Sequence, residues 1–145
     1  MAADATLIYM VGRVNQGIRR EMTTRLARWS LSVAEYTTLS VLGSRPRLSN
    51  AQLARRALVT PQSMIEILAR LEDRGLVARS ADPDHGRILR AALTAHGREV
   101  LDAANPAIDA LHEELFAGVP ARQRQAAAAA MHAAMANLSR KNQVS

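Results

Sequence analysis

Two helix start signals lie within a dozen residues of each other in the middle of the sequence. Ser49 is followed three residues later by Gln52, so the hydroxyl and the amide can each satisfy a backbone N–H group of the other residue, as in a capping box. Thr60 is a second N-cap, because Pro61 follows at the first helical position, where a missing N–H group costs no hydrogen bond. Helices that begin so close together need a tight turn between them, so the sequence predicts a helix-turn-helix.

The second of these helices has one apolar face and one polar face. Its apolar positions recur at helical spacing at Met64, Ile67, Leu68 and Leu71, opposite Gln62, Glu66, Ala69, Arg70 and Asp73. Gly75 is placed to end the helix in a left-handed conformation. Such a helix fits a DNA major groove, although a polar outer face is equally typical of an ordinary surface helix.

A basic hairpin is predicted after the helix-turn-helix. Residues 76–79 and 87–93 have the composition and alternation of two short strands, and Leu48 is placed to add a third. The intervening ADPDHGR segment is rich in turn residues and too polar to be buried. A strand pair whose loop ends at Arg87 is typical of the wing of a winged helix.

The remainder of the chain is expected to be helical. Hydrophobic residues make up 48% of the 145 residues and aromatic residues only 3%, so the core must consist of Ala, Leu, Val, Ile and Met, which favour helix over sheet. The length suits one domain, 1–145. We therefore predict a mainly α fold with a small antiparallel β wing.

Long apolar helices are predicted on both sides of the winged lobe, which we place at 32–94. Residues 5–29 form one amphipathic helix, and residues 95–141 form further helices, with a kink expected at Pro106. These helices have too little of their own chain to bury against. We therefore expect a symmetric dimer joined through the N- and C-terminal helices, the alternative being a monomeric bundle packed on itself.

The positive charge is concentrated in the same central region. Residues 45 to 98 contain ten arginines and five acidic residues, a balance of +5, whereas the rest of the chain has nine basic and eight acidic residues, a balance of +1. This distribution favours contact with the phosphates of DNA. The predicted phosphate contacts are Arg55, Arg56, Arg74, Arg79 and Arg90, and we add Ser49 and Gln52 at the start of the first helix.

Several classes of protein are disfavoured. The chain has no cysteine, which excludes disulfides, thiolate zinc sites and thiol-based sensing. No apolar run is long enough to span a bilayer and no signal peptide is recognisable, so we expect a cytoplasmic protein without membrane contact. The four histidines lack metal-ligand spacing, and no catalytic motif or cofactor loop is present, so we expect no metal, no cofactor and no enzyme.

The runs LARWSLSVAEYTTLSVL, LSNAQLARRALVTPQSMIEILARLEDRGLVARS and DPDHGRILRAALTAHG closely resemble the MarR family of bacterial transcriptional regulators. The resemblance covers about residues 5 to 140. It implies a dimeric winged-helix regulator, more often a repressor, that binds a pseudo-palindromic operator. It further implies that the second helix contacts the major groove and the wing arginine the minor groove. The implied DNA-binding residues are Thr60, Pro61, Gln62, Ser63, Glu66, Arg70, Asp84 and Arg87.

The chemistry of these residues suggests different roles. Arg87 suits a narrow minor groove, and Gln62 can bind adenine through its amide. Arg70 can reach guanine or a phosphate, and we expect Glu66, four residues earlier, to brace it. By resemblance, Asp84 pairs with an arginine and holds the loop in shape. The alternative for each is a structural or solvated side chain.

Many family members release DNA when a small aromatic ligand binds, so the resemblance implies such an effector. The candidates for lining its site are Trp29, Tyr36 and His112, with core packing as the alternative. Two other functions remain open. One is a small-molecule-binding helical dimer without specific DNA binding, and the other, least favoured by the motifs, is an enzyme.

Overall fold

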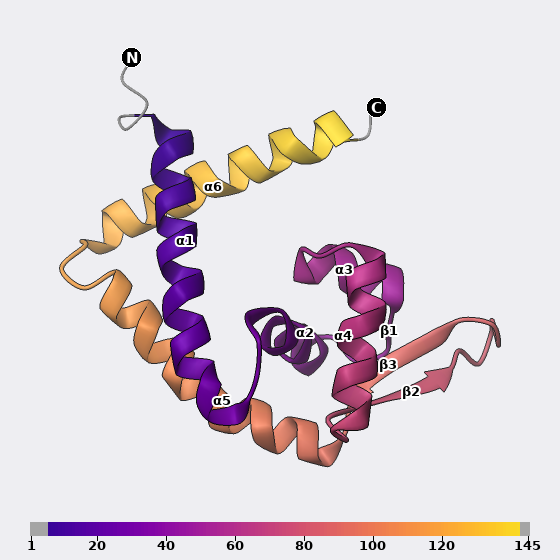
Figure 1. Ribbon diagram of the computed structural model, residues 1–145. Helices are drawn as coiled ribbons and strands as arrows, with labels where there is room; N and C mark the ends of the chain where they lie inside the picture. The colour runs from indigo at the N-terminus through magenta and orange to yellow at the C-terminus, as the bar shows by residue number, and fades with distance from the viewer. Residues whose placement is uncertain (1–5, 143–145) are drawn as a thin grey trace. The chain divides into compact units, whose positions relative to one another are not determined.

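The computed structural model describes residues 6–142 and is mainly helical, with one small sheet (Figure 1). The chain divides into two compact units, one up to Asp109 and the other from Ala110. The elements are α1 (Leu7–Leu26), η2 (Ala27–Trp29), α2 (Val33–Ser44), β1 (Leu48–Ser49), α3 (Asn50–Ala57), α4 (Pro61–Asp73), β2 (Val77–Ala81), β3 (Leu89–Leu93), α5 (Ala95–Leu115) and α6 (Ala121–Asn142). The predicted fold class, a mainly α winged helix with an antiparallel β wing, is confirmed.

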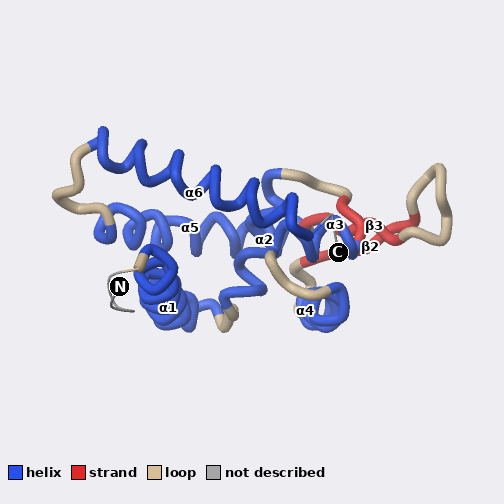
Figure 2. The backbone as a smooth tube through the Cα atoms, turned by 90° about the horizontal axis from the view of Figure 1, so that it is seen from above, coloured by secondary structure: helices blue, strands red, loops and turns tan. Residues whose placement is uncertain are grey.

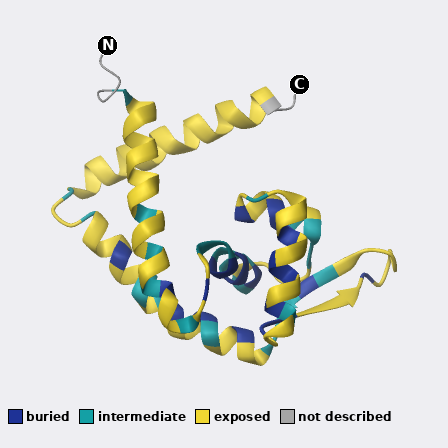
Figure 3. Cartoon of the chain, in the orientation of Figure 1, coloured by how far each residue is buried: buried dark blue, intermediate teal, exposed yellow. Residues whose placement is uncertain are grey.

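The core of the first unit lies where α2, α3, α4 and the sheet meet (Figure 3). The large apolar side chains that are fully buried come from helices α1 to α4 and from the segment before β2: Leu26, Leu39, Leu42, Leu53, Met64, Leu68, Leu71 and Leu76. The four apolar positions predicted on α4 are all buried. Burial of such side chains is the main stabilising contribution to this unit, at about 1.5–3 kcal/mol for each.

The helix starts occur where the sequence predicts them. A capping box forms at Ser49, and the Thr60 hydroxyl accepts a hydrogen bond from the Ser63 amide at 3.1 Å. A further capping box, at Ser32, opens α2. Between α3 and α4, Leu58 adopts a left-handed φ of 59°, and this residue closes the tight turn. Gly75 follows α4 with a φ of 68°, as predicted.

The three strands form an antiparallel sheet in the order β1-β3-β2. In this sheet Leu48 pairs with Ala91, so the predicted third strand is present. Strands β2 and β3 begin one and two residues later than predicted, because the backbone amides just before them are used in other hydrogen bonds. The Leu76 amide is used to close α4 on the carbonyl of Leu71, and the Ile88 amide closes a turn on His85. Figure 2 shows the β2–β3 loop projecting beyond helices α2 to α4.

The N-terminal helix is shorter than predicted. Its expected first residue, Ala5, lies outside the described residues, and α1 ends at Leu26 instead of Trp29. The chain continues as the 3-10 turn η2, and Ser30, with a left-handed φ of 52°, ends the helical path after it.

Helix α5 continues through Pro106 without a break, and the kink expected there stays a prediction. The second unit contains the end of α5 and helix α6, joined through Gly118, which has a φ of 74°. None of the helices between residues 6 and 142 combines the length and apolarity needed to cross a bilayer.

Candidate nucleic-acid interface

The outer face of α4 is exposed, and its start is fixed from two sides. Asn50 Nδ2 of α3 donates to the carbonyl oxygen of Pro61 at 3.1 Å, and the Thr60 hydroxyl donates to Ser63 Oγ at 2.9 Å. Gln62 is exposed and makes no hydrogen bond or ion pair to any described residue. The first turn of α4 is therefore held rigidly, while the side-chain amide of Gln62 remains available for a ligand.

Arg70 is braced by an acid that the sequence analysis did not select. Its Nε donates to Glu35 Oε1 of α2 at 3.1 Å, and the Glu35 side chain is only 8% exposed. Glu66, the expected brace, makes no ion pair within residues 6–142, so that prediction is wrong. The physical reason is that the i,i+4 pair competes with a partly buried carboxylate that is already oriented by the Ser32 amide.

Arg74, a predicted phosphate contact, is held against its own chain. Its guanidinium donates at 2.8 Å to the carbonyl oxygens of Trp29 and Ser30, and its Nη1 lies 3.9 Å from Glu35 Oε2. These contacts join the end of α4 to the turn after η2. They use two of the five N–H donors of the guanidinium.

Arg79 and Glu72 form an ion pair between β2 and the last turn of α4. Ser49 and Gln52 are likewise engaged in their capping box. Gln52 Oε1 also accepts from Arg90 Nη1 at 3.0 Å. These four predicted DNA-binding residues are therefore placed where they hold the lobe together.

Asp82 organises the wing loop. Its Oδ1 accepts from the backbone amides of Asp84 and His85, at 2.8 and 3.1 Å, and its Oδ2 accepts from Arg90 Nε. These donors, with the Arg90 hydrogen bond the strongest, lower the pKa of Asp82 from 3.8 to about 2. The ion pair expected at Asp84 is made instead by Asp82. Asp82 stands at the start of the loop, and the loop folds back over its side chain. Asp84 itself is exposed.

Arg87 is fully available in the described part of the chain. It is exposed in the loop between β2 and β3 and makes no internal hydrogen bond or ion pair there. Arg55, on the exposed side of α3, is in the same situation. Arg56 is likewise exposed on α3 and has no hydrogen bond or ion pair to a described residue. The other predicted DNA-binding arginines, Arg70, Arg74, Arg79 and Arg90, are used in internal contacts.

Two of the residues selected for an effector site belong to the core of the first unit. Tyr36 is 8% exposed, and its hydroxyl donates to Asn105 Oδ1 at 3.0 Å. Burial, together with the nearby carboxylate of Asp109, raises the pKa of Tyr36 above its usual 10.0. Trp29 is half-buried against this core, with the Arg28 guanidinium 5.5 Å from its ring centroid.

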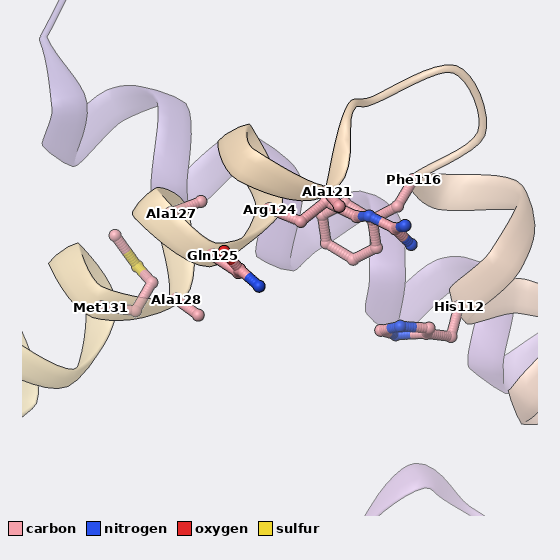
Figure 4. Close-up of a pocket in the computed structure, with 8 residues that line it drawn as sticks. All are labelled: His112, Phe116, Ala121, Arg124, Gln125, Ala127, Ala128 and Met131. Atoms are coloured by element: carbon pink, nitrogen blue, oxygen red, sulfur yellow. The ribbon is translucent and has the colours of Figure 1, made fainter.

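His112, the third of these residues, lies in the second unit. It lines a pocket of about 490 Å³ with Phe116, whose ring centroid is 5.2 Å away, and with residues of α6 that include Arg124 and Met131 (Figure 4). This lining is predominantly apolar, with one guanidinium. Among the described residues there is no group of three or more His, Asp or Glu side chains that could hold a metal ion.

Comparison with known proteins gives a consistent relationship. The family model described as "MarR family" matches residues 29–88. The HTH-type transcriptional repressor Rv2887 of Mycobacterium tuberculosis is 40% identical over 125 residues, which cover 86% of this chain and 90% of the repressor. The transcriptional regulator HosA of Escherichia coli is 31% identical over 113 residues, covering 74% of this chain and 84% of HosA.

The solved structures agree. A MarR family regulator from Silicibacter pomeroyi superposes with a TM-score of 0.84 at 26% identity, covering 94% of this chain and 92% of that one. Rv2887 in complex with salicylic acid superposes with a TM-score of 0.72 at 38% identity, covering 91% and 98% of the two chains. Because the sequence relationship extends over most of both chains and the winged-helix fold is shared, the chain belongs to the MarR family.

Proposed function

We propose that this chain is a sequence-specific DNA-binding transcriptional repressor that acts as a homodimer and is released from its operator by a small aromatic acid. The single observation that supports DNA binding most directly is the state of Arg87. This arginine is exposed on a projecting loop with no internal partner among the described residues, while Asp82 and Arg90 hold that loop in shape. An unpaired guanidinium on a rigid support suits the negative potential of a minor groove.

The polar outer face of α4 supports the same function. Its first turn is fixed through Asn50 and Thr60, and its last turn through Arg74, so the exposed Gln62 is presented on a rigid helix. Rigid presentation lowers the entropy that base recognition would cost. We therefore assign base contacts to Gln62 and Ser63, and phosphate contacts to Arg55 and to the outer nitrogens of Arg70.

The dimer proposal is based on apolar side chains that the chain leaves uncovered. The start of α1 exposes six of them: Leu7, Ile8, Tyr9, Met10, Val11 and Val14. On α6, Met131, Met135 and Leu138 are also exposed. Exposed apolar side chains in such numbers on a helix mark an interaction site, and we propose a second copy of the chain as the partner of each helix. Two-fold symmetry would present two α4 helices to the two halves of a pseudo-palindrome.

An aromatic acid is proposed as effector because the relative Rv2887 has been solved with salicylic acid and with p-aminosalicylic acid. Trp29, Tyr36 and His112 remain our candidates for contacting it. Regulation by binding alone needs no catalytic step, and we propose no enzymatic activity. A repressor that acts on chromosomal DNA belongs in the cytoplasm.

The test is a binding titration of the full chain against the DNA upstream of its own coding sequence, at two salt concentrations, with salicylate added to the preformed complex. We expect nanomolar affinity for one site, a steep fall in affinity with salt, and release by salicylate. Binding that does not distinguish this DNA from scrambled DNA would overturn the repressor proposal. Salicylate binding without any DNA binding would favour the alternative, a small-molecule-binding dimer.

A further inference from the structure

Three exposed apolar side chains of the winged lobe line one groove. In the stretch from residue 31 to residue 94, all of which is described, Leu58, Ile65, Ile88 and Leu89 are the large apolar side chains that are more than one-third exposed. All except Leu58 line a groove of about 480 Å³, together with Ser49, Arg79 and Arg87. The exposed apolar surface of this lobe is therefore concentrated at one place.

The position of the groove relates it to the DNA-facing elements. Ile65 comes from α4, Ile88 and Leu89 come from the wing, and the first residues of α3 also contribute to the lining. A helix in the major groove and a wing in the adjacent minor groove would lie on either side of one sugar–phosphate strand. The groove between α4 and the wing is where that strand would pass.

The lining has the mixed chemistry of a nucleotide strand. Arg87 offers a guanidinium without an internal partner in the described chain, and the start of α3 places the positive end of a helix dipole at the groove. The aliphatic side chains match the carbons of deoxyribose and the methyl group of thymine, which is exposed in the major groove.

Ile65 stands out on α4. The other residues on the outer face of this helix are polar or small, whereas Ile65 lies between Gln62 and Ala69 and is 48% exposed. About half of this aliphatic side chain is left uncovered within the first unit, at the centre of a face that otherwise suits water. It suits an apolar group on a base edge.

We propose that this groove seats one strand of the operator and that Ile65 is a specificity-determining residue, which packs on the 5-methyl group of a thymine. The proposal rests on the DNA-binding function proposed above and adds a base preference to it. The thymine methyl is the apolar group that the major groove offers, so Ile65 distinguishes thymine from cytosine and from uracil at one position of each half-site.

The test combines a substitution in the protein with a substitution in the DNA. Operator duplexes are prepared with deoxyuridine in place of each thymine in turn, which removes one methyl group and leaves the charge and the base pairing unchanged. Affinities are measured by fluorescence anisotropy for the wild type, for Ile65→Ala and for Leu58→Ala. The last variant is the matched control, because Leu58 is 90% exposed and lies outside the groove lining.

At one thymine of each half-site, we expect deoxyuridine to weaken binding of the wild type and of Leu58→Ala about fourfold, the effect of losing one buried methyl group. The same duplex should be bound by Ile65→Ala no more weakly than the unmodified operator. Ile65→Ala itself should bind the unmodified operator about tenfold more weakly, with an unchanged slope of affinity against salt, since no phosphate contact is lost.

Several outcomes would overturn the proposal. If deoxyuridine weakens Ile65→Ala and the wild type equally at every position, Ile65 does not contact a thymine methyl. If Ile65→Ala binds as tightly as the wild type but fails to repress, the groove docks another protein. If the wild type itself binds no DNA, the proposed function and this inference fail together, whereas wild-type binding with no effect of Ile65→Ala removes this inference alone. Thermal unfolding of each variant verifies that the fold is intact.

Discussion

Glu35 on α2 and Arg70 on α4 are joined by a hydrogen bond of 3.1 Å between Oε1 and Nε. The same carboxylate accepts from the Ser32 amide at 2.9 Å and lies 3.9 Å from Arg74. One buried acid therefore caps α2 and fixes the C-terminal half of α4. The orientation of α4 depends on a contact made 35 residues away in the sequence.

Replacing Glu35 with Gln should lower the free energy of unfolding by about 1–2 kcal/mol, because two arginines lose their charged partner. The value is modest since the Arg70 side chain is 54% exposed and water screens part of the interaction. Urea denaturation measures the effect. Glu66→Gln is the control, since Glu66 is exposed on the same helix as Arg70 and should change stability by less than about 0.5 kcal/mol. Equal stability of the two variants would show that the Glu35 contacts contribute nothing.

The sequence predicts the local features of this lobe well. The capping box at Ser49, the N-cap at Thr60 and the apolar face of α4 depend on residues three or four positions apart, and all three occur. The partner of Arg70 depends on how two distant helices pack, so helical spacing selected Glu66 instead of Glu35. A local rule cannot identify a tertiary partner.

The same limit of local rules explains why several predicted DNA-binding arginines are paired within the protein. A surplus of arginine indicates a nucleic-acid partner, but the balance of charge does not tell which arginines are paired inside the protein. Arg74 and Arg90 bind carbonyl and carboxylate oxygens of their own chain. Conversely, Ile65 was missed because it is apolar, although its place on a polar helix face was visible in the sequence.

Arg87 and Arg90 are three residues apart and should differ in what their removal does. Arg87→Ala should weaken operator binding tenfold or more and reduce the slope of log affinity against log salt concentration by about one. It should not change stability, because Arg87 has no internal contact in the described structure. Arg90→Ala should lower the free energy of unfolding by more than the roughly 0.5 kcal/mol typical of surface positions, since Asp82 and Gln52 lose a partner. Anisotropy titrations and urea denaturation of both variants measure this. A loss of stability in Arg87→Ala alone would contradict the assignment.

Asp82 should make stability depend on acidic pH. Its pKa in the folded protein is lowered to about 2, below the value of 3.8 expected when the chain is unfolded. The stabilisation by the Asp82 carboxylate is therefore complete above about pH 4 and is lost as the pH falls toward 2. In Asp82→Asn this contribution is absent. The difference in unfolding free energy between wild type and variant should shrink from pH 5 to pH 2, and a constant difference would exclude the assigned ionisation.

Gly97 and Gly12 provide a comparison between packing and helix propensity. A Cβ atom at Gly97 would lie 1.9 Å from the carbonyl oxygen of Leu76, whereas one at Gly12 would meet nothing within 4 Å in the described chain. Both glycines are in helices, where propensity alone favours alanine by up to about 1 kcal/mol. Gly97→Ala should therefore destabilise the protein by about 3 kcal/mol or more, and Gly12→Ala should not destabilise the monomer. Thermal unfolding distinguishes the signs, and a stable Gly97→Ala would show that α5 is not in contact with Leu76.

The exposed apolar start of α1 should be needed for dimer formation. Val14 is 51% exposed, and Val14→Glu places a charge on a surface that we propose to be buried between two subunits, where an unpaired carboxylate is costly. Gln16→Glu adds the same charge to an exposed position of the same helix and serves as the control. Light scattering during size-exclusion chromatography should show the wild type and Gln16→Glu as dimers and Val14→Glu shifted toward monomer at micromolar concentration. Because a half-site binds weakly alone, operator affinity should fall together with the dimer, and a monomeric variant that keeps full affinity would contradict two-fold binding.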